Sequence, residues 1–210
     1  MMFSRRGAFS FANERPILLG GALCLDFINT IGWRGDPIRT IEFIPSYSEL
    51  VHWSLGSGVL DQHKSAHLID EGLRNPAKST AALEVAKELR VELESAFDPD
   101  LRQSTNLSIA TAILRSVGDL EMLVAGADGL RWTSTATGSD ILLPLVPVAI
   151  SGLELATSRK REMVKRCADQ DCAWLFIDDT RNHSRRWCSM EDCGNRAKAG
   201  AHYARRKQNF

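Results

Sequence analysis

Four of the five cysteines lie in the last fifth of the 210-residue chain, in two pairs of equal spacing. Four residues separate Cys167 from Cys172 and Cys188 from Cys193, and fifteen residues lie between the pairs. Two such pairs can place four thiolates around one ion, and soft thiolates select zinc or an iron–sulfur centre. Intracellular zinc modules commonly carry two cysteine pairs of this kind, so zinc is favoured over an iron–sulfur centre. We therefore predict one Zn²⁺ bound by all four side chains.

The predicted ion has a structural role, because this end of the chain is poor in apolar side chains. The large ones after residue 164 are few, chiefly Trp174, Leu175, Phe176, Ile177 and Trp187. So small a core does not fold alone, whereas structural zinc contributes about 10–16 kcal/mol in small fingers. Four cysteine ligands leave no open coordination position, so we expect no catalytic residue here. Two disulfides, or buried thiols without a metal, are the alternatives, but disulfides are rare in the cytosol.

A basic helix is predicted to follow the last cysteine. Ser189 and Asp192 have the spacing of a capping box, which predicts a helix from about Met190 to Lys207. Its alanines form a narrow stripe that we expect to pack against the ribbon, and its cations cover the rest. Between residues 197 and 210 there is no acidic residue. We predict DNA binding through phosphate contacts. The candidate DNA-binding residues are Arg185, Arg186, Arg196, Lys198, Arg205, Arg206 and Lys207.

The net charge of zero hides an uneven distribution. Residues 158–210 hold 13 Lys and Arg against 7 Asp and Glu, a balance of +6. The first 157 residues therefore carry 13 against 19, or −6. A basic tail on an acidic body is typical of a nucleic-acid-binding module attached to another domain. We predict a boundary there, with domains at 1–157 and 158–210.

The first domain reads as mainly helical. Apolar spacing and capping residues predict helices within 20–33, 47–55, 61–71, 76–97, 110–120 and 147–156. Apolar and polar residues alternate over 130–135, and residues 141–143 are all apolar. This pattern predicts a β-hairpin. The predicted fold class is therefore mainly α with a small β-hairpin (α+β), followed by the four-cysteine ribbon and the basic helix.

Polar residues interrupt the first apolar stretch. Asp26 and Asn29 fall on one helical turn, ahead of Trp33 and Arg34. One interpretation makes these four a ligand pocket, in which Arg34 would suit an anion. The other makes them braces for the turn at residues 35–37, since buried polar groups near turns usually satisfy backbone groups. Both interpretations stay open, and the second is favoured.

These residues carry a resemblance. A resemblance to the CGNR zinc-finger family rests on three stretches: the run from Cys172 to Phe176, the run from Asn182 to Met190, and Cys193-Gly-Asn-Arg-Ala-Lys. A resemblance to the ABATE domain, which precedes that finger in this bacterial family, rests on Leu23-Cys-Leu-Asp-Phe-Ile-Asn-Thr and Trp33-Arg-Gly-Asp-Pro. The resemblance implies a stress-induced transcription regulator that binds DNA. It also implies an N-terminal domain that senses a small molecule or mediates assembly, with a homodimer as one form.

Two other functions fit the same residues. The N-terminal domain could be an enzyme that acts on a small molecule through Asp26, with the finger as an accessory. The zinc–thiolate site could instead be a redox switch, because basic neighbours expose thiolates to oxidation. No stretch approaches the roughly 20 apolar residues of a membrane span, so we expect no membrane partner and a cytoplasmic location.

Overall fold

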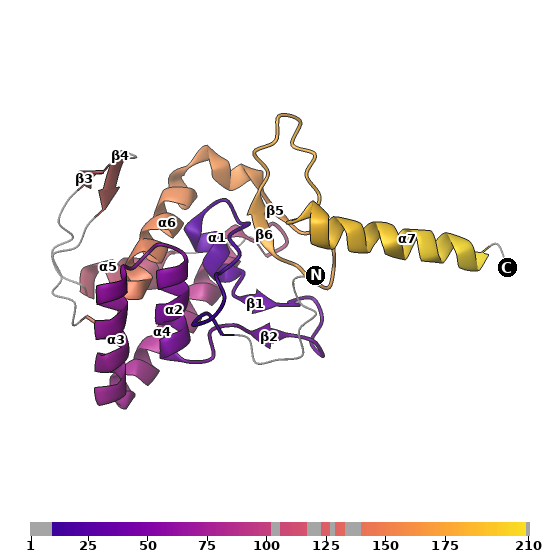
Figure 1. Ribbon diagram of the computed structural model, residues 1–210. Helices are drawn as coiled ribbons and strands as arrows, with labels where there is room; N and C mark the ends of the chain where they lie inside the picture. Colours follow the sequence, from indigo (N-terminus) through magenta and orange to yellow (C-terminus); the bar gives the residue numbers. More distant parts are fainter. Residues whose placement is uncertain (1–9, 102–105, 117–122, 127–128, 133–139, 209–210) are drawn as a thin grey trace.

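The computed structural model describes residues 10–101, 106–116, 123–126, 129–132 and 140–208. It is mostly helical, with short antiparallel two-stranded hairpins (Figure 1). A four-cysteine cluster lies in its C-terminal part. The fold class predicted from the sequence is therefore confirmed. None of the described helices is both long and apolar enough to cross a membrane.

The elements follow one another in this order. The α-helices are α1 (Leu23–Ile28), α2 (Tyr47–Gly56), α3 (Gln62–Arg74), α4 (Pro76–Phe97), α5 (Ser108–Ser116), α6 (Val146–Thr157) and α7 (Asn195–Gln208). The strand pairs are β1 (Ile31–Gly32) with β2 (Ile41–Glu42), β3 (Leu123–Gly126) with β4 (Gly129–Trp132), and β5 (Val164–Arg166) with β6 (Leu175–Ile177). Short 3-10 turns cover Leu143–Leu145 and Arg159–Met163, and a π-helical turn covers Met190–Gly194.

The helices begin where local chemistry places them. The Asp61 carboxylate accepts a hydrogen bond from the Lys64 N–H at 2.8 Å and so caps α3. Pro76 occupies the first turn of α4, where its missing N–H costs nothing. The Ser189 hydroxyl accepts from the Asp192 N–H at 3.3 Å, as the predicted capping box requires.

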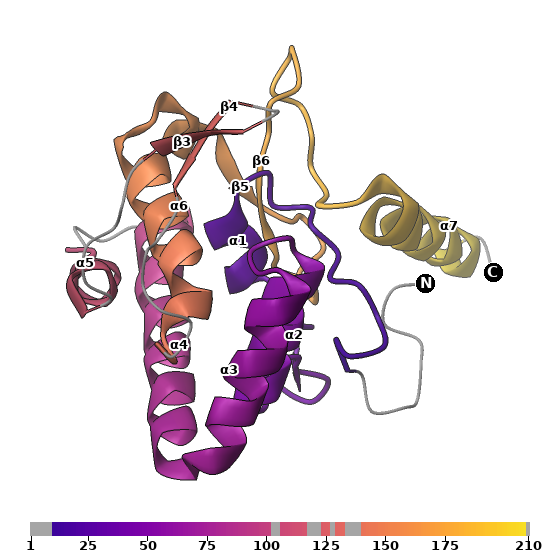
Figure 2. The same cartoon turned by 60° about the vertical axis from the view of Figure 1, so that its left-hand side comes forward.

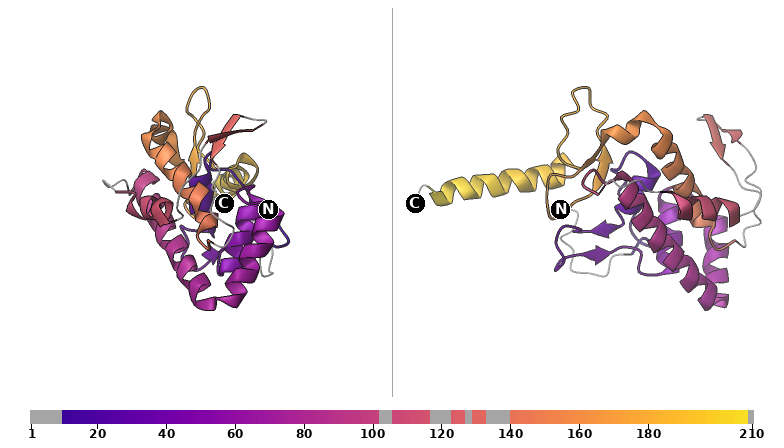
Figure 3. Two further views of the ribbon diagram at one scale, coloured as in Figure 1. Left: turned by 90° about the vertical axis from the view of Figure 1, so that its left-hand side faces the viewer. Right: turned by 180° about the vertical axis from the view of Figure 1, so that it is seen from behind.

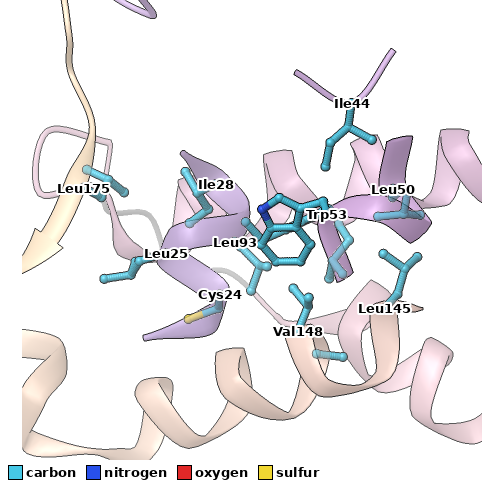
Figure 4. Close-up of a cluster of buried hydrophobic side chains, with 14 of the residues drawn as sticks. Cys24, Leu25, Ile28, Ile44, Leu50, Trp53, Leu93, Leu145, Val148 and Leu175 are labelled. Carbon is cyan, nitrogen blue, oxygen red and sulfur yellow. The ribbon is translucent and has the colours of Figure 1, made fainter. Parts of the chain in front are cut away.

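Helix α1 lies at the centre of the molecule. Helices α4 and α6 flank one side of it, and α2 with α3 lies on the other (Figure 2). The close-up of the core shows Leu25 and Ile28 of α1 beside Leu175 of β6 (Figure 4). Strand β6 belongs to the cysteine-bearing segment, so that segment and the helical part share one hydrophobic core.

Two sequence predictions are wrong in detail. The first helix ends at Ile28, and Ile31 lies in β1; Trp33, with a positive φ of 52°, then begins the loop that connects β1 to β2. The predicted hairpin of residues 130–135 and 141–143 has a different partner: Leu130 of β4 pairs with Ala125 of β3, and residues 133–135 lie outside the described residues. Leu143 instead begins a 3-10 turn, where Pro144 cannot donate a ladder hydrogen bond.

Helix α7 extends outward from the body, which is clearest from behind (Figure 3). A Cβ atom added at Gly200 would meet nothing within 4 Å, and the Tyr203 side chain is 65% exposed. The stripe expected to pack against the ribbon consists of Ala197, Ala201 and Ala204. Ala197 is half-buried, and the side chains of Ala201 and Ala204 lie outside the described part of the structure.

Candidate metal centre

Four sulfur atoms meet at the base of α7. The ligand atoms of Cys167, Cys172, Cys188 and Cys193 all lie within 4.8 Å of one another. The Sγ atom of Cys188 is 3.6 Å from the Sγ atoms of both Cys172 and Cys193. Sulfurs at about 2.3 Å from one tetrahedral zinc ion would lie about 3.8 Å apart, whereas a disulfide needs about 2.05 Å. The arrangement is that of a metal site, and the predicted ligand set is brought together.

The β5–β6 hairpin and the loop after it position these ligands. Cys167 follows β5 directly, and its N–H donates to the Trp174 carbonyl at 2.8 Å. The Ala168 N–H donates to the Arg186 carbonyl at 2.8 Å, which ties the second cysteine pair to the first. All four cysteines are buried, with exposed fractions of 1–4%. Water therefore has little access to the sulfurs.

The four thiols interact too closely to titrate independently. Hydrogen bonds from the other three thiols lower the pKa of Cys167, while hydrogen bonding to Cys167 raises the pKa of Cys172 and Cys188. A divalent ion would deprotonate the thiols that bind it. The donor set of four soft sulfurs fits Zn²⁺.

Arg196 braces this site from outside. Its Nη2 atom donates to the Cys193 Sγ atom at 3.1 Å, and its Nε atom donates to the Asp169 Oδ2 atom at 2.7 Å. Its guanidinium also lies 4.7 Å from the ring centre of Trp33, in a cation–π contact. Arg196 thus links the metal ligand Cys193 to the N-terminal part of the chain.

Arg185 is similarly engaged within the protein. Its side chain donates to the backbone carbonyls of Trp187 and Cys188, and its guanidinium stacks 4.4 Å from the centre of the Phe176 ring. The other predicted cations differ. Lys198, Arg205 and Arg186 are exposed, and Arg186 lies over Trp187. The side chains of Arg206 and Lys207 lie outside the described part of the structure.

Asn29 joins the N-terminal part to the metal-bearing segment. Its Nδ2 atom donates to the Leu175 carbonyl at 2.8 Å, and its Oδ1 atom accepts from the Leu175 N–H at 2.9 Å. Asn29 is 3% exposed, so these two bonds satisfy a buried strand end. The two bonds of Asn29 brace β6, which lies far away in the chain, and not the turn at residues 35–37.

A close approach of two backbones strengthens the same junction. The Gly35 N–H donates to the Asp171 carbonyl at 3.1 Å, and a Cβ atom at Gly35 would lie 1.6 Å from the Gln170 carbonyl oxygen. No side chain fits there, which explains the glycine of the Trp33-Arg-Gly-Asp-Pro stretch. The Trp174 indole N–H also donates to the Ile31 carbonyl at 2.8 Å.

The four residues of the candidate ligand pocket separate into two groups. Asp26 and Asn29 line a cavity of about 60 Å³. Trp33 and Arg34 are not part of its lining: Trp33 lies between Arg39 and Arg196, and Arg34 forms a buried ion pair with Glu94. Arg34 therefore has a carboxylate partner already.

Asp26 is the buried carboxylate of this cavity. It is 7% exposed, and its Oδ1 atom accepts from the Gly20 N–H at 2.7 Å. Burial raises the pKa of the Asp26 carboxyl from 3.8 to about 6, and backbone hydrogen bonds offset this only in part. A raised pKa means that the folded state favours the protonated form, so ionisation of Asp26 destabilises the fold.

We predict that Asp26→Asn stabilises the protein at pH 7.5 and not at pH 4. The stability that Asp26 contributes is present below pH 4 and is lost as pH rises through about 6. A pKa rise from 3.8 to about 6 corresponds to about 3 kcal/mol at most, and asparagine keeps an oxygen for the Gly20 N–H. Urea unfolding at both pH values measures this difference.

Asp70→Asn, at an exposed acid on α3, is the control and should show no such pH-dependent gain. Equal effects of Asp26→Asn at pH 4 and pH 7.5 would contradict the prediction.

Sequence reasoning missed the residues that join the two parts. Asp169, Trp174 and Gly35 join the two parts through partners far away in the chain, and no local spacing marks that role. The glycine in an otherwise polar turn was the one available signal, since an essential glycine often marks a close backbone approach.

Comparison with known families agrees with this geometry. The CGNR zinc finger model matches residues 163–206, and the ABATE model, "Putative stress-induced transcription regulator", matches residues 21–159. No curated protein matches the chain. The finger match covers all four sulfur ligands, and the ABATE match covers α1 to α6. With most of its length matched, this chain belongs to the ABATE family and carries a C-terminal CGNR zinc finger.

Proposed function

We propose that this protein is a transcription regulator that binds DNA through α7, with a structural Zn²⁺ at the base of that helix. The observation that carries the proposal is the helix itself. It projects from the body, and residues 197–208 include no acid (Figure 1). An outward helix with exposed Lys198 and Arg205 suits the phosphates that border a major groove.

The engaged arginines narrow the set of DNA contacts. Arg196 and Arg185 already bind groups within the finger, so we assign them to holding the metal loop. Lys198, Arg205 and Arg186 are the described cations that remain at the surface. We also propose that the metal has no catalytic role, because four cysteines fill a tetrahedral shell.

The proposal predicts how DNA affinity depends on salt. For the zinc-loaded protein and random duplex DNA, the logarithm of the binding constant should fall linearly with the logarithm of the salt concentration. Lys198→Ala/Arg205→Ala should make this slope less steep by about 2. Fluorescence anisotropy across a salt series measures the slope.

Lys64→Ala/Lys78→Ala removes the same charge from α3 and α4 and serves as the control. If both double variants have the slope of the unmodified protein, α7 is not the DNA-binding surface.

We further propose that the N-terminal part carries the effector site of the regulator. The cavity beside Asp26 supports this, because Trp174 of the finger forms part of its wall. An occupant of that cavity would contact both the helical part and the metal-bearing segment.

A further inference from the structure

The cavity beside Asp26 is lined by three parts of the chain: an N-terminal strap, the helical part and the metal-bearing segment. The N-terminal strap, residues 10–20, crosses its outer side, with its start held by Glu49, which accepts from Ser10 Oγ at 2.6 Å and from Phe11 N at 2.8 Å. The end of the strap is fixed by the bond from Gly20 to Asp26. The lining residues are Phe11, Glu14, Arg15, Pro16, Ile17, Asp26, Asn29, Thr30, Phe43, Trp53 and Trp174.

Four aromatic side chains form part of the cavity wall. Phe11, Phe43, Trp53 and Trp174 come from four separate segments and have exposed fractions of 9%, 9%, 1% and 3%. The Phe11 and Phe43 rings meet edge to face, with centroids 6.4 Å apart. Aromatic faces carry partial negative charge, so a group of them attracts a cation.

Asp26 adds a full negative charge to the same wall. Among the described residues it forms no ion pair, and its recorded partners are backbone N–H groups. A buried carboxylate without a cation is costly unless a ligand supplies one. An anion is disfavoured beside the ionised carboxylate. Arg34 lies outside the lining and is paired with Glu94, and Arg15, which does line the cavity, is exposed to solvent. A purely apolar ligand would leave the carboxylate uncompensated.

We propose that this cavity binds a small organic ammonium ion, with Asp26 as its counter-ion and the four aromatic side chains as its walls. A volume of about 60 Å³ suits a head group of a few heavy atoms. Glu14 and Arg15 of the strap line the cavity and are exposed, so a longer substituent would reach solvent beside them. This choice of ligand class rests on the proposed effector role of the cavity and not on DNA binding.

Occupancy of the cavity would reach the metal centre through two side chains. Trp174 contacts the ligand space and donates to the Ile31 carbonyl, and it lies two residues after Cys172. Asn29 lines the same space and holds Leu175. A bound ammonium ion therefore stabilises the arrangement in which the finger is docked on the helical part.

Titration calorimetry of the zinc-loaded full chain, without DNA, tests the site. The probes are methylammonium, trimethylammonium and choline, and 3,3-dimethylbutan-1-ol serves as an uncharged analogue of choline. We expect at least one ammonium probe to bind with a dissociation constant of about 1 mM or tighter, and the alcohol to bind at least about tenfold more weakly.

Variants then identify the counter-ion. Asp26→Asn should weaken binding at least about tenfold, Phe43→Leu should weaken it less, and Asp70→Asn should leave it unchanged. Affinity should rise between pH 5 and pH 7.5 as Asp26 ionises. Glu14 and Arg15 also line the cavity, so Glu14→Gln is measured in parallel and should retain this pH dependence.

Three outcomes overturn the ligand class: no saturable binding of any ammonium probe, equal binding of the uncharged alcohol, or unchanged affinity in folded Asp26→Asn. DNA affinity is measured separately, with and without the probe. DNA binding that persists without any ammonium binding removes only the ligand class, whereas ammonium binding without DNA binding removes only the DNA proposal.

Discussion

Removal of the metal is expected to unfold the whole chain and not only the finger. In small fingers structural zinc contributes about 10–16 kcal/mol, which matches or exceeds the about 5–15 kcal/mol that stabilises a typical domain. Strand β6 lies in the same core as α1, so losing the metal-held hairpin also exposes Leu25 and Ile28 (Figure 4). Helical circular dichroism during melting, with and without EDTA under reducing conditions, measures the loss.

Two serine variants separate metal loss from loss of a thiol. Cys188→Ser should contain no zinc and melt like the chelated protein. Cys24→Ser is the control: that thiol is fully buried on α1, burial raises its pKa to about 12, and it lies outside the cluster. It should keep one zinc per chain. A chelated protein whose helices melt at the original temperature would show instead that the two parts fold independently.

Asn29→Leu should strongly destabilise the fold. Leucine has a similar size but leaves both the N–H and the carbonyl of Leu175 without their partner. Each buried group left unsatisfied costs about 1–3 kcal/mol, so we expect a loss of about 2–6 kcal/mol in the free energy of unfolding. Urea unfolding measures the loss, and hydrogen exchange at the Leu175 amide locates it.

Asn182→Leu provides the matched control, because Asn182 is exposed. Asn29→Asp gives an intermediate test, since it keeps the acceptor for the Leu175 N–H and loses the donor. If Asn29→Leu costs no more than Asn182→Leu, Asn29 does not hold the finger in place.

The sequence was sufficient for features that depend on local spacing. Two equally spaced cysteine pairs predicted a sulfur cluster, and Asp61, Pro76 and Ser189 marked helix starts, because ligand spacing and capping act over a few residues. It was insufficient where distant segments decide. Asn29 bonds Leu175 across 146 positions, so its partner could not be read from its neighbours.

The basic residues of the finger show the same limit. Arg185, Arg196 and Arg205 look equivalent in a cationic stretch, yet the first two are held by carbonyls, a carboxylate and a sulfur within the protein. Only tertiary structure separates a bracing arginine from a surface one. Charge counts therefore predicted that the tail is basic, but not which of its cations face outward.

Helix α7 is attached to the body at its N-terminal end, next to the metal-binding cysteines, so a small rotation there moves its far end the most. Its 14 residues span about 21 Å, and its first turn follows ligand Cys193 directly. A tilt of about 10° at the attached end would carry the far end about 4 Å, more than the roughly 0.5 Å range of hydrogen-bond lengths. The bonds of Arg196 to Asp169 and Cys193 lie at the attached end of α7, where a small change in angle gives the largest displacement of the far end. They therefore help to fix the direction in which α7 projects.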